Sequence, residues 1–309
     1  MRLLVTGGAG FIGSHLVERL LALGHEVAVL DDLSSGHREN LPPGVRLHVA
    51  SVAGPAIDEI VAAERPEAIF HLAAQVDAAR SVREPLFDAE VNVLGTVRLL
   101  AAAAGAGVRR FVLASSAAVY GEPDALPVEE SHPHRPLSPY GIAKSAAERY
   151  LGFFARERGV AGVALRFANV YGPRQTAHGE AGVVAVFCRR LLAGEPVVVH
   201  GDGRQTRDFV HVDDVVGAAV ASLGAPPGAY NVATGVESDV LAVATELRRR
   251  LAPAAPVVHA AARPGDPRRS ALSPQLAARE LGFRAAVPLV EGLARTASWF
   301  QSHPEGRER

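Results

Sequence analysis

Cysteine is almost absent from this chain of 309 residues, in which Cys188 is the only one. A single cysteine excludes an intramolecular disulfide and a metal site built from several cysteines. Cys188 lies within the apolar run Val183 to Leu192, and this setting favours a buried core thiol over a reactive one. We therefore expect neither thiol chemistry nor a metal site.

Long apolar runs and an excess of charge of one sign are also absent. No stretch reaches the roughly 18 apolar residues that a membrane-spanning helix needs, so no membrane partner is expected. The formal net charge is −1, which lacks the basic footprint of a nucleic-acid-binding protein. The chain begins MRLLVTGG, without a basic region followed by a long apolar one, so we expect no secretory signal and a cytoplasmic location.

Lysine is nearly absent as well, because Lys144 stands alone against 31 arginines. A GC-rich genome can account for the general replacement of lysine by arginine, but not for the one position at which lysine remains. Lysine carries a compact charge of tunable pKa, whereas arginine carries a wide planar fork. The surroundings of Lys144 must therefore decide whether it has a function.

Apolar strands alternate with helical segments through the first half of the chain. Strands of nearly continuous apolar character are typical of a parallel sheet that helices cover on both faces. The expected strands are Arg2 to Thr6, Glu26 to Leu30, Val45 to Val49, Ala68 to Leu72, Arg110 to Ala114 and Val160 to Phe167. The expected helices are Phe11 to Leu23, Ile57 to Glu64, Pro85 to Ala104 and Ser138 to Arg158.

This alternation ends near residue 168, beyond which proline and glycine become more frequent. The pattern predicts an α/β protein with a doubly wound parallel sheet of Rossmann type and a smaller C-terminal substrate-binding lobe. We assign residues 1–167 to the Rossmann domain, with 201–223 returning to it. Residues 168–200 and 224–309 are assigned to the smaller lobe.

The first expected strand runs into a glycine-rich turn that opens a helix. Gly7, Gly10 and Gly13 permit a tight turn and a close approach of the backbone to a pyrophosphate, which then lies at the helix N-terminus. The second strand ends at Asp31, 18 residues after Gly13, where a carboxylate can accept hydrogen bonds from both hydroxyls of a ribose and would repel a 2′-phosphate. The turn and Asp31 together favour binding of NAD over NADP.

Tyr140 and Lys144 are four residues apart in a helical segment, so both side chains share one helix face. A free tyrosine has a pKa near 10 and is a poor base at neutral pH, but a neighbouring ammonium stabilises its phenolate. Ser115 and Ser116 end the preceding strand, at the edge of the sheet where ligands of such folds bind. Because Lys144 is the only lysine, this spacing predicts a catalytic centre.

With these residues placed, the chain resembles the extended short-chain dehydrogenase/reductase family, and within it the bacterial UDP-glucose (UDP-galactose) 4-epimerases. The resemblance covers nearly the whole chain. Its motifs are TGGAGFIGSH at Thr6 to His15, LDDLSSG at Leu30 to Gly36, HLAAQ at His71 to Gln75, SSAAVYG at Ser115 to Gly121, SPYGIAK at Ser138 to Lys144, NVYGPRQ at Asn169 to Gln175, GEAGVVAVF at Gly179 to Phe187, GDGRQTRDFVHVDD at Gly201 to Asp214 and RPGD at Arg263 to Asp266.

The resemblance implies a set of residues for each part of the site. The implied catalytic residues are Ser116, Tyr140 and Lys144. The implied NAD contacts are Gly7, Gly10, Phe11, Ile12, Gly13, Asp31, Asp32, Ser35, Ser51, Val52, Leu72, Ala73, Ala74, Gln75, Asn92, Tyr140 and Lys144. The implied contacts to a UDP-sugar are Ser116, Tyr140, Asn169, Val183, Val198, His200, Arg207, Arg263, Asp266 and Ser270. The two arginines would bind the diphosphate through charge-assisted hydrogen bonds.

The implied reaction inverts C4 of a UDP-hexose through a transient 4-keto sugar. Tyr140 would take the proton of the 4-hydroxyl while NAD accepts and later returns the hydride, and Ser116 would hydrogen-bond the 4-oxygen. Related 4,6-dehydratases carry Asp-Glu after the active-site threonine, and decarboxylases keep a glutamate nearby. Ala117 and Ala118 occupy those positions here and can carry no proton, which favours epimerisation.

The chain departs from the family pattern at three positions, of which one concerns the cofactor, one the base and one the sugar. Ser51 replaces an aspartate that contacts adenine, His200 replaces an aromatic residue that packs on uracil, and Ser270 replaces a bulky tyrosine near the sugar. UDP-glucuronate, UDP-GlcNAc and dTDP-sugars therefore remain alternative substrates. A reductase that releases NADH and, in a different class, a non-catalytic NAD-binding scaffold are further alternatives.

Members of this family commonly dimerise by packing two long helices from each subunit. The matching segments are Asn92 to Ala104 and Tyr140 to Arg158. Leu94, Leu151 and Phe154 are expected on their outer faces, so we expect a homodimer.

Overall fold

The main sheet of this computed structural model has seven parallel strands in the order β10-β6-β5-β4-β1-β2-β3. The structure describes residues 1–176, 182–261 and 267–303. The strands are β1 (Arg2–Thr6), β2 (Glu26–Asp31), β3 (Arg46–Val49), β4 (Ala68–His71), β5 (Arg110–Ser116), β6 (Ala161–Phe167) and β10 (Gly228–Val232). This confirms the parallel sheet of Rossmann type that the alternation of strands and helices predicts.

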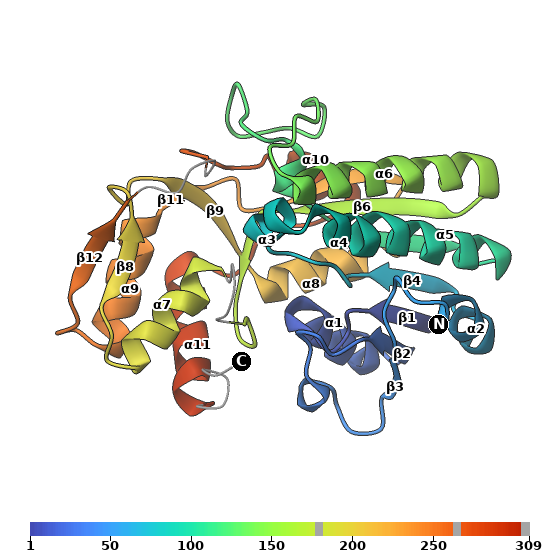
Figure 1. Ribbon diagram of the computed structural model, residues 1–309, viewed down its shortest axis with the longest axis horizontal. Helices are drawn as coiled ribbons and strands as arrows, with labels where there is room; N and C mark the ends of the chain where they lie inside the picture. Colours follow the sequence, from blue (N-terminus) through green and yellow to red (C-terminus); the bar gives the residue numbers. More distant parts are fainter. Residues whose placement is uncertain (177–181, 262–266, 304–309) are drawn as a thin grey trace.

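Helices cover both faces of the sheet (Figure 1). On one face pack α1 (Phe11–Ala22), α8 (Val212–Ala221) and α10 (Gln275–Leu281), and on the other pack α2 (Ile57–Glu64), α5 (Thr96–Gly105) and α6 (Pro139–Arg158). Side chains of successive strand residues point to opposite faces, so Leu3 and Val5 enter the first core and Leu4 enters the second. Burial on both faces explains why the strands read as nearly continuous apolar runs.

A smaller lobe lies beside the sheet, at the left of Figure 1. It has its own apolar core, built from α7 (Val183–Leu192), α9 (Val240–Leu251) and α11 (Leu289–Ser302) around the paired strands β8 (Val197–His200) and β12 (Val257–Ala260). Cys188 lies in this core with no exposed surface, as its apolar setting predicts, and burial raises the pKa of its thiol to about 12. A three-stranded sheet is formed by β7 (Asn169–Tyr171), β9 (Thr206–His211) and β11 (Glu237–Asp239).

The boundary between the two parts differs in detail from the sequence-based assignment. Strand β10 pairs with β6 in the main sheet, although residues 224–309 are assigned to the smaller lobe from sequence. Helix α8, within 201–223, does pack on α1 against the main sheet. Strand β9, in the same range, belongs to the three-stranded sheet instead. The domain limits therefore stay a proposal, with β10 moved to the Rossmann domain.

The single helix expected over Pro85 to Ala104 is wrong in its interior. The chain forms α4 (Pro85–Ala89), a π-helical segment (Glu90–Gly95) and then α5, and a further short helix, α3 (Ala78–Arg83), precedes them. None of the helices in the described residues is long and apolar enough to span a membrane.

Candidate functional site

The glycine-rich turn between β1 and α1 lies at the carboxyl edge of the sheet, where it approaches the end of β4. A Cβ on Gly7 would lie 2.6 Å from the backbone nitrogen of Ala73, and Gly7 has a positive φ of 69°. A Cβ on Gly13 would lie 2.0 Å from the carbonyl oxygen of Gly7. These two positions therefore exclude any side chain, and the bare backbone stays available to a ligand at the start of α1.

Asp31 ends β2 beside this turn and is only 6% exposed. One carboxylate oxygen accepts from the backbone nitrogen of Ala9 and the other from that of Leu33, both at 2.9 Å. Burial raises the pKa of Asp31, and these two backbone hydrogen bonds oppose the rise. A carboxylate has about four lone-pair positions, so two remain for the hydroxyls of a ribose.

The residues at this edge fit NAD. The fit rests on three observations: two glycines that no side chain can replace, a helix N-terminus behind them and a carboxylate at the end of β2. The remaining predicted cofactor contacts surround the same edge. Asp32 and Ser35 are exposed beyond β2, Ser51 and Val52 follow β3, and Leu72, Ala73, Ala74 and Gln75 follow β4, while Phe11 and Ile12 open α1.

The π-helical segment aims Asn92 at the loop after β4. The Asn92 side chain accepts from the backbone nitrogen of Gln75 at 3.0 Å and donates to its carbonyl oxygen at 2.8 Å. Asp88 accepts from the side chains of Gln75 (2.8 Å) and Asn92 (2.9 Å). Asn92 therefore holds the loop in place and is itself only 2% exposed.

Helix α6 begins with a cap that presents its first turn to the end of β5. Ser138 accepts from the backbone nitrogen of Gly141 at 3.2 Å, and Pro139 occupies the first helical position. The backbone nitrogen of Tyr140 donates to the buried hydroxyl of Ser81 at 3.1 Å. No sequence pattern indicates this contact, because Ser81 lies 59 residues away on α3.

Ser116, Tyr140 and Lys144 come together as expected. Ser116 lies close enough to the Tyr140 hydroxyl to lower its pKa. The Lys144 ammonium lies 5.8 Å from the centroid of the Tyr140 ring and donates to the carbonyl oxygen of Ala114 at 3.0 Å. Ser115, the other serine at the strand end, is 3% exposed and donates to Glu148, so it is occupied away from the tyrosine.

Burial opposes the charged forms of both functional groups. Burial raises the pKa of Tyr140 to about 12, while the hydrogen bond to Ser116 lowers it. Burial lowers the pKa of Lys144 to about 8, against the attraction of Asp88 and Glu148, which raises it. With a pKa of about 8, Lys144 remains mostly protonated at neutral pH, so its positive charge is available to Tyr140.

The predicted substrate contacts lie in or beside the smaller lobe. Asn169 starts β7 and is exposed, Arg207 in β9 is 8% exposed, and Val198 and His200 share one side of β8. Val183 starts α7 and Ser270 is half-buried. Arg263 and Asp266 lie outside the described residues. The hydrogen bonds described above therefore connect the predicted cofactor and catalytic residues to one another and to their neighbours, whereas the predicted substrate residues are linked by fewer of them.

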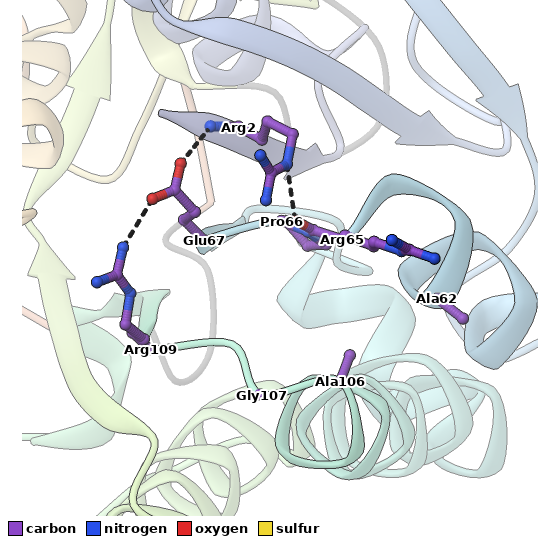
Figure 2. A pocket seen from close by; sticks show the side chains of 8 residues that line it. All are labelled: Arg2, Ala62, Arg65, Pro66, Glu67, Ala106, Gly107 and Arg109. Carbon is purple, nitrogen blue, oxygen red and sulfur yellow. Dashed lines mark hydrogen bonds and ion pairs between the residues drawn. The ribbon is translucent and has the colours of Figure 1, made fainter.

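A hollow of about 340 Å³ lies at the opposite edge of the main sheet (Figure 2). Its lining includes Arg2 at the start of β1, with Glu67 and Arg109 directly before β4 and β5. Glu67 accepts from the backbone nitrogen of Arg2 at 2.9 Å and from the Arg109 side chain at 2.7 Å. These groups satisfy one another at the amino ends of the strands, away from the glycine-rich turn and Tyr140. In the described residues, no cluster of three or more potential metal ligands is present.

Comparison with known proteins identifies the family of this chain. A family model described as "NAD dependent epimerase/dehydratase family" matches residues 3–233. A UDP-glucose 4-epimerase of Mycolicibacterium smegmatis is 48% identical over 98% of this chain and 99% of its own length. The solved UDP-glucose 4-epimerase of Thermotoga maritima with UDP-glucose is 43% identical, with a TM-score of 0.96 over 98% of this chain and 100% of the other. That of Thermus thermophilus with NAD is 44% identical, with a TM-score of 0.94 over 97% and 99%.

Proposed function

This chain belongs to the NAD-dependent epimerase/dehydratase family, and on that premise we propose that it interconverts UDP-glucose and UDP-galactose by inverting C4 of the hexose. The comparisons support an NAD-dependent nucleotide-sugar 4-epimerase. The identity of the hexose is what we propose in addition. The observation that carries it is the grouping of Ser116, Tyr140 and Lys144 at the carboxyl end of β5, at the edge of the sheet where the NAD-binding turn also lies.

Each member of this group has a separate role. Tyr140 is the base that takes the proton from the sugar 4-hydroxyl and returns it at the end of the cycle. Ser116, whose hydroxyl influences the pKa of Tyr140, binds the same sugar oxygen and aligns it with the phenol. Lys144 brings a positive charge to within 5.8 Å of the ring centroid, and this charge stabilises the phenolate.

NAD, when bound, would supply the reversible hydride acceptor for C4 of the sugar. Gly7, Gly10 and Gly13 would accommodate its pyrophosphate and Asp31 its adenosine ribose, while the loop after β4, held by Asn92, would line it. Ala117 and Ala118 follow Ser116 directly and provide no second acid or base. Hydride transfer at C4 can therefore be followed by its return but not by elimination of water from the neighbouring carbons.

The smaller lobe would hold the nucleotide. Arg207, almost fully buried in β9, would neutralise the diphosphate together with Arg263. Asn169, Val183, Val198, His200, Asp266 and Ser270 would complete this half of the site. A small residue at Ser270 also leaves space for a larger substituent, which makes UDP-GlcNAc the first alternative substrate to test.

The deciding experiment is a turnover assay with a panel of sugar nucleotides. Purified enzyme would be incubated with UDP-galactose, UDP-GlcNAc, UDP-glucuronate and a dTDP-hexose, and the product sugars would be separated by chromatography. We expect UDP-galactose and UDP-glucose to interconvert fastest, without net formation of NADH. Steady accumulation of NADH would identify a reductase instead, and binding of NAD without turnover of any sugar would identify a scaffold.

Tyr140→Phe tests the catalytic assignment. It removes the hydroxyl but retains the ring against Lys144, so we expect kcat to fall by about 10²–10⁴-fold while bound NAD is retained. The measurement is kcat beside the NAD content of the purified protein. Turnover near the wild-type rate would exclude Tyr140 as the base.

We also propose that the enzyme is a homodimer. Large apolar side chains are exposed on α3, the α4 region and α6, which pack against one another. Leu86 is 86% exposed, Leu94 is 52% exposed and Phe153 is 45% exposed. The sequence-based choice of Leu151 and Phe154 as outer residues is wrong, because Leu151 is 4% exposed and packs in the core together with Phe154.

The cytoplasmic location stays a prediction from the sequence.

A further inference from the structure

Glu148 is a buried carboxylate one helical turn beyond Lys144, outside the catalytic group described above. Tyr140, Lys144 and Glu148 are spaced by four residues on α6 and therefore share one face of the helix. The Glu148 side chain is only 8% exposed. Burying a carboxylate to this degree costs free energy unless hydrogen bonds and an opposite charge compensate for the lost hydration. The residues that pair with Glu148 therefore indicate its role.

Three successive residues at the end of β5 contact these three residues of α6. The carbonyl of Ala114 accepts from Lys144 and the hydroxyl of Ser115 donates to Glu148, while Ser116 lowers the pKa of Tyr140. The two hydrogen bonds fix two successive turns of the helix to two successive residues of the strand. Glu148 thereby provides the second of two hydrogen-bonded ties that set the catalytic face of α6 against the strand end.

Glu148 is held from the other side by Arg166 in β6. Arg166 donates to one oxygen of Glu148 through Nη2 at 2.7 Å and to the other through Nε at 3.0 Å, and its side chain is 7% exposed. Arg166 pairs with Ser115 across the two strands, so both partners of Glu148 come from one position in the sheet. A two-pronged contact of this kind fixes both the position and the charge of the carboxylate.

Arg166 is itself fixed by neutral partners. Its Nη1 donates to the Tyr120 hydroxyl at 2.8 Å, and its Nη2 lies 2.7 Å from Nε2 of His134, which must accept because guanidinium nitrogens only donate. His134 is therefore neutral and donates through Nδ1 to Ser145 at 2.8 Å. Burial lowers the pKa of His134, in agreement with the neutral form. The pair of Glu148 and Arg166 therefore places a carboxylate of fixed position beside Lys144.

We propose that Glu148 is a positioning residue that keeps Lys144 charged and aligned with Tyr140, acting through its ties to Ser115 and Arg166. The proposal rests on the proposed function only in making Lys144 the partner of the catalytic tyrosine. The geometry itself, two side-chain hydrogen bonds between α6 and the end of β5, does not depend on the identity of the sugar.

The charged and titratable groups that face Lys144 come from four elements. Asp88 in α4 and Glu148 in α6 attract the ammonium, and burial opposes its charge, with the net result that the pKa of Lys144 falls to about 8. His71 in β4 is neutral, since burial lowers its pKa to about 3. Arg166 in β6 stands behind Glu148, and Tyr140 lies one turn before Lys144. Removal of the Glu148 charge would take away an attraction and leave Arg166 uncompensated, and both changes lower the lysine pKa.

The single lysine allows a direct test without any substrate. Protein labelled with ¹³C at the lysine ε-carbon gives one lysine signal, from Lys144, and its shift against pH reports the titration. In the holoenzyme, Glu148→Gln should move the midpoint down by about one pH unit or more relative to wild type. An unchanged midpoint in folded Glu148→Gln would overturn the proposal, whether or not UDP-galactose is the substrate.

Glu64→Gln is the matched control, because Glu64 is another largely buried glutamate that pairs with an arginine. It accepts from Arg46 and His48, each at 2.7 Å, and is 11% exposed, but it lies on α2. We expect Glu64→Gln to leave the Lys144 midpoint unchanged, and Glu148→Asp to restore most of the wild-type value. A shift in Glu64→Gln as large as that in Glu148→Gln would show a general effect of the substitution and contradict the proposal.

Activity gives the second readout. In Glu148→Gln, the alkaline limb of the kcat–pH profile should move to lower pH together with the lysine midpoint, while KM stays within about two-fold. Ser115→Ala leaves the Glu148–Arg166 pair intact, so it decides the question if Glu148→Gln fails to fold. We expect Ser115→Ala to lower kcat several-fold at constant KM, and a wild-type kcat would show that the tie to β5 has no role.

Discussion

Gly13 and Gly152 both lie within helices, yet only one of them excludes a side chain. A Cβ at Gly13 would lie 2.0 Å from the carbonyl oxygen of Gly7, whereas a Cβ at Gly152 meets nothing within 4 Å. The sequence motif identifies Gly13 as part of a turn that binds a dinucleotide. The structure adds the reason, which is the close packing of α1 against the end of β1.

Gly13→Ala tests this packing. Because the clash is with backbone, the turn must shift, and we expect a loss of about 1–3 kcal/mol in the free energy of unfolding together with loss of most of the bound NAD. Gly152→Ala is the control and should stabilise α6 by about 0.5–1 kcal/mol. Thermal unfolding and the NAD released on denaturation would measure both effects. Gly13→Ala with full NAD and wild-type stability would refute the assignment of the turn.

The composition of the chain singles out Lys144, because it is the only lysine. In the structure Lys144 is 5% exposed, and its ammonium donates to the carbonyl of Ala114. Sequence analysis does not identify Glu148 as a residue of the site, although it lies four residues beyond Lys144. The i, i+4, i+8 spacing places Tyr140, Lys144 and Glu148 on one helix face, but a glutamate on a helix is usually exposed to solvent.

At the scale of elements, a chain of buried hydrogen bonds joins β1, β4 and the helix after the π-helical segment. Thr96 donates to the carbonyl of Asn92 at 2.7 Å, so its oxygen accepts from Nε2 of His71 at 2.9 Å. Nδ1 of His71 then accepts from Thr6 at 2.7 Å, and the Thr6 oxygen accepts from the backbone nitrogen of Ala73 at 3.2 Å. This series of hydrogen bonds leaves His71 neutral, with its proton on Nε2, and links the cofactor loop to α5.

Thr96→Val breaks this chain while keeping the side-chain shape. The buried Nε2–H of His71 would lose its acceptor, so we expect a loss of about 1–3 kcal/mol in the free energy of unfolding, measured by urea denaturation. Thr245→Val is the matched control, because Thr245 makes the same contact to the carbonyl four residues earlier but is exposed on α9. If both variants lost the same free energy of unfolding, the hydrogen bond to His71 would contribute nothing to stability beyond the local contact of the hydroxyl with the helix carbonyl.

The same histidine predicts how stability depends on pH. Burial lowers the pKa of His71 from 6.5 to about 3, so the folded state takes up its proton only in strong acid, whereas the unfolded state takes it up below pH 6.5. The contribution of neutral His71 is therefore complete above pH 6.5 and is lost as the pH falls toward 3.

Wild type and His71→Gln should therefore differ less as the medium is acidified. We expect the difference between their free energies of unfolding to narrow by about 2 kcal/mol between pH 6.5 and about pH 5. Denaturant titrations at a series of pH values would measure it. A difference that stays constant over this range would mean that His71 is accessible to protons in the folded state.

At the scale of the whole molecule, the exposed apolar side chains on α3, the α4 region and α6 contrast with those of the smaller lobe. Leu86 in α4 is 86% exposed and Val290 in α11 is 58% exposed. Isolated apolar residues on a surface need no explanation, but several on adjacent packed helices mark an interface. The homodimer proposal assigns Leu86 to that interface and leaves Val290 outside it.

Leu86→Glu should therefore produce monomers at micromolar concentration, while Val290→Glu should leave the oligomeric state unchanged. Burying an unpaired carboxylate in an apolar interface costs several kcal/mol, and each ~1.4 kcal/mol raises the dissociation constant of the dimer about tenfold. Light scattering coupled to size-exclusion chromatography would measure the mass of each variant. A monomeric wild type, or a dimeric Leu86→Glu, would contradict this choice of surface.

The strands and helices of the Rossmann domain could be predicted because their signals are local. Apolar runs, the turn Gly7 to Gly13, Asp31 at a strand end and the spacing of Tyr140 and Lys144 all lie within short stretches of chain. The π-helical segment could not be predicted in this way. Its hydrogen bonds depend on Gln75 and Asp88, which contact Asn92 only after the loop and helix have packed.

Residue types at fixed spacing were enough to predict the class of fold and NAD as the cofactor, and they singled out Ser116, Tyr140 and Lys144 as the proposed catalytic group. Tertiary structure alone decided the pairing of β10 with β6, the separation of Ser115 from Ser116 and the joint hold of Arg166 and Ser115 on Glu148. These contacts join residues that are far apart along the chain. No local pattern encodes them, because they follow from burial of polar groups that must find partners where the packed elements meet.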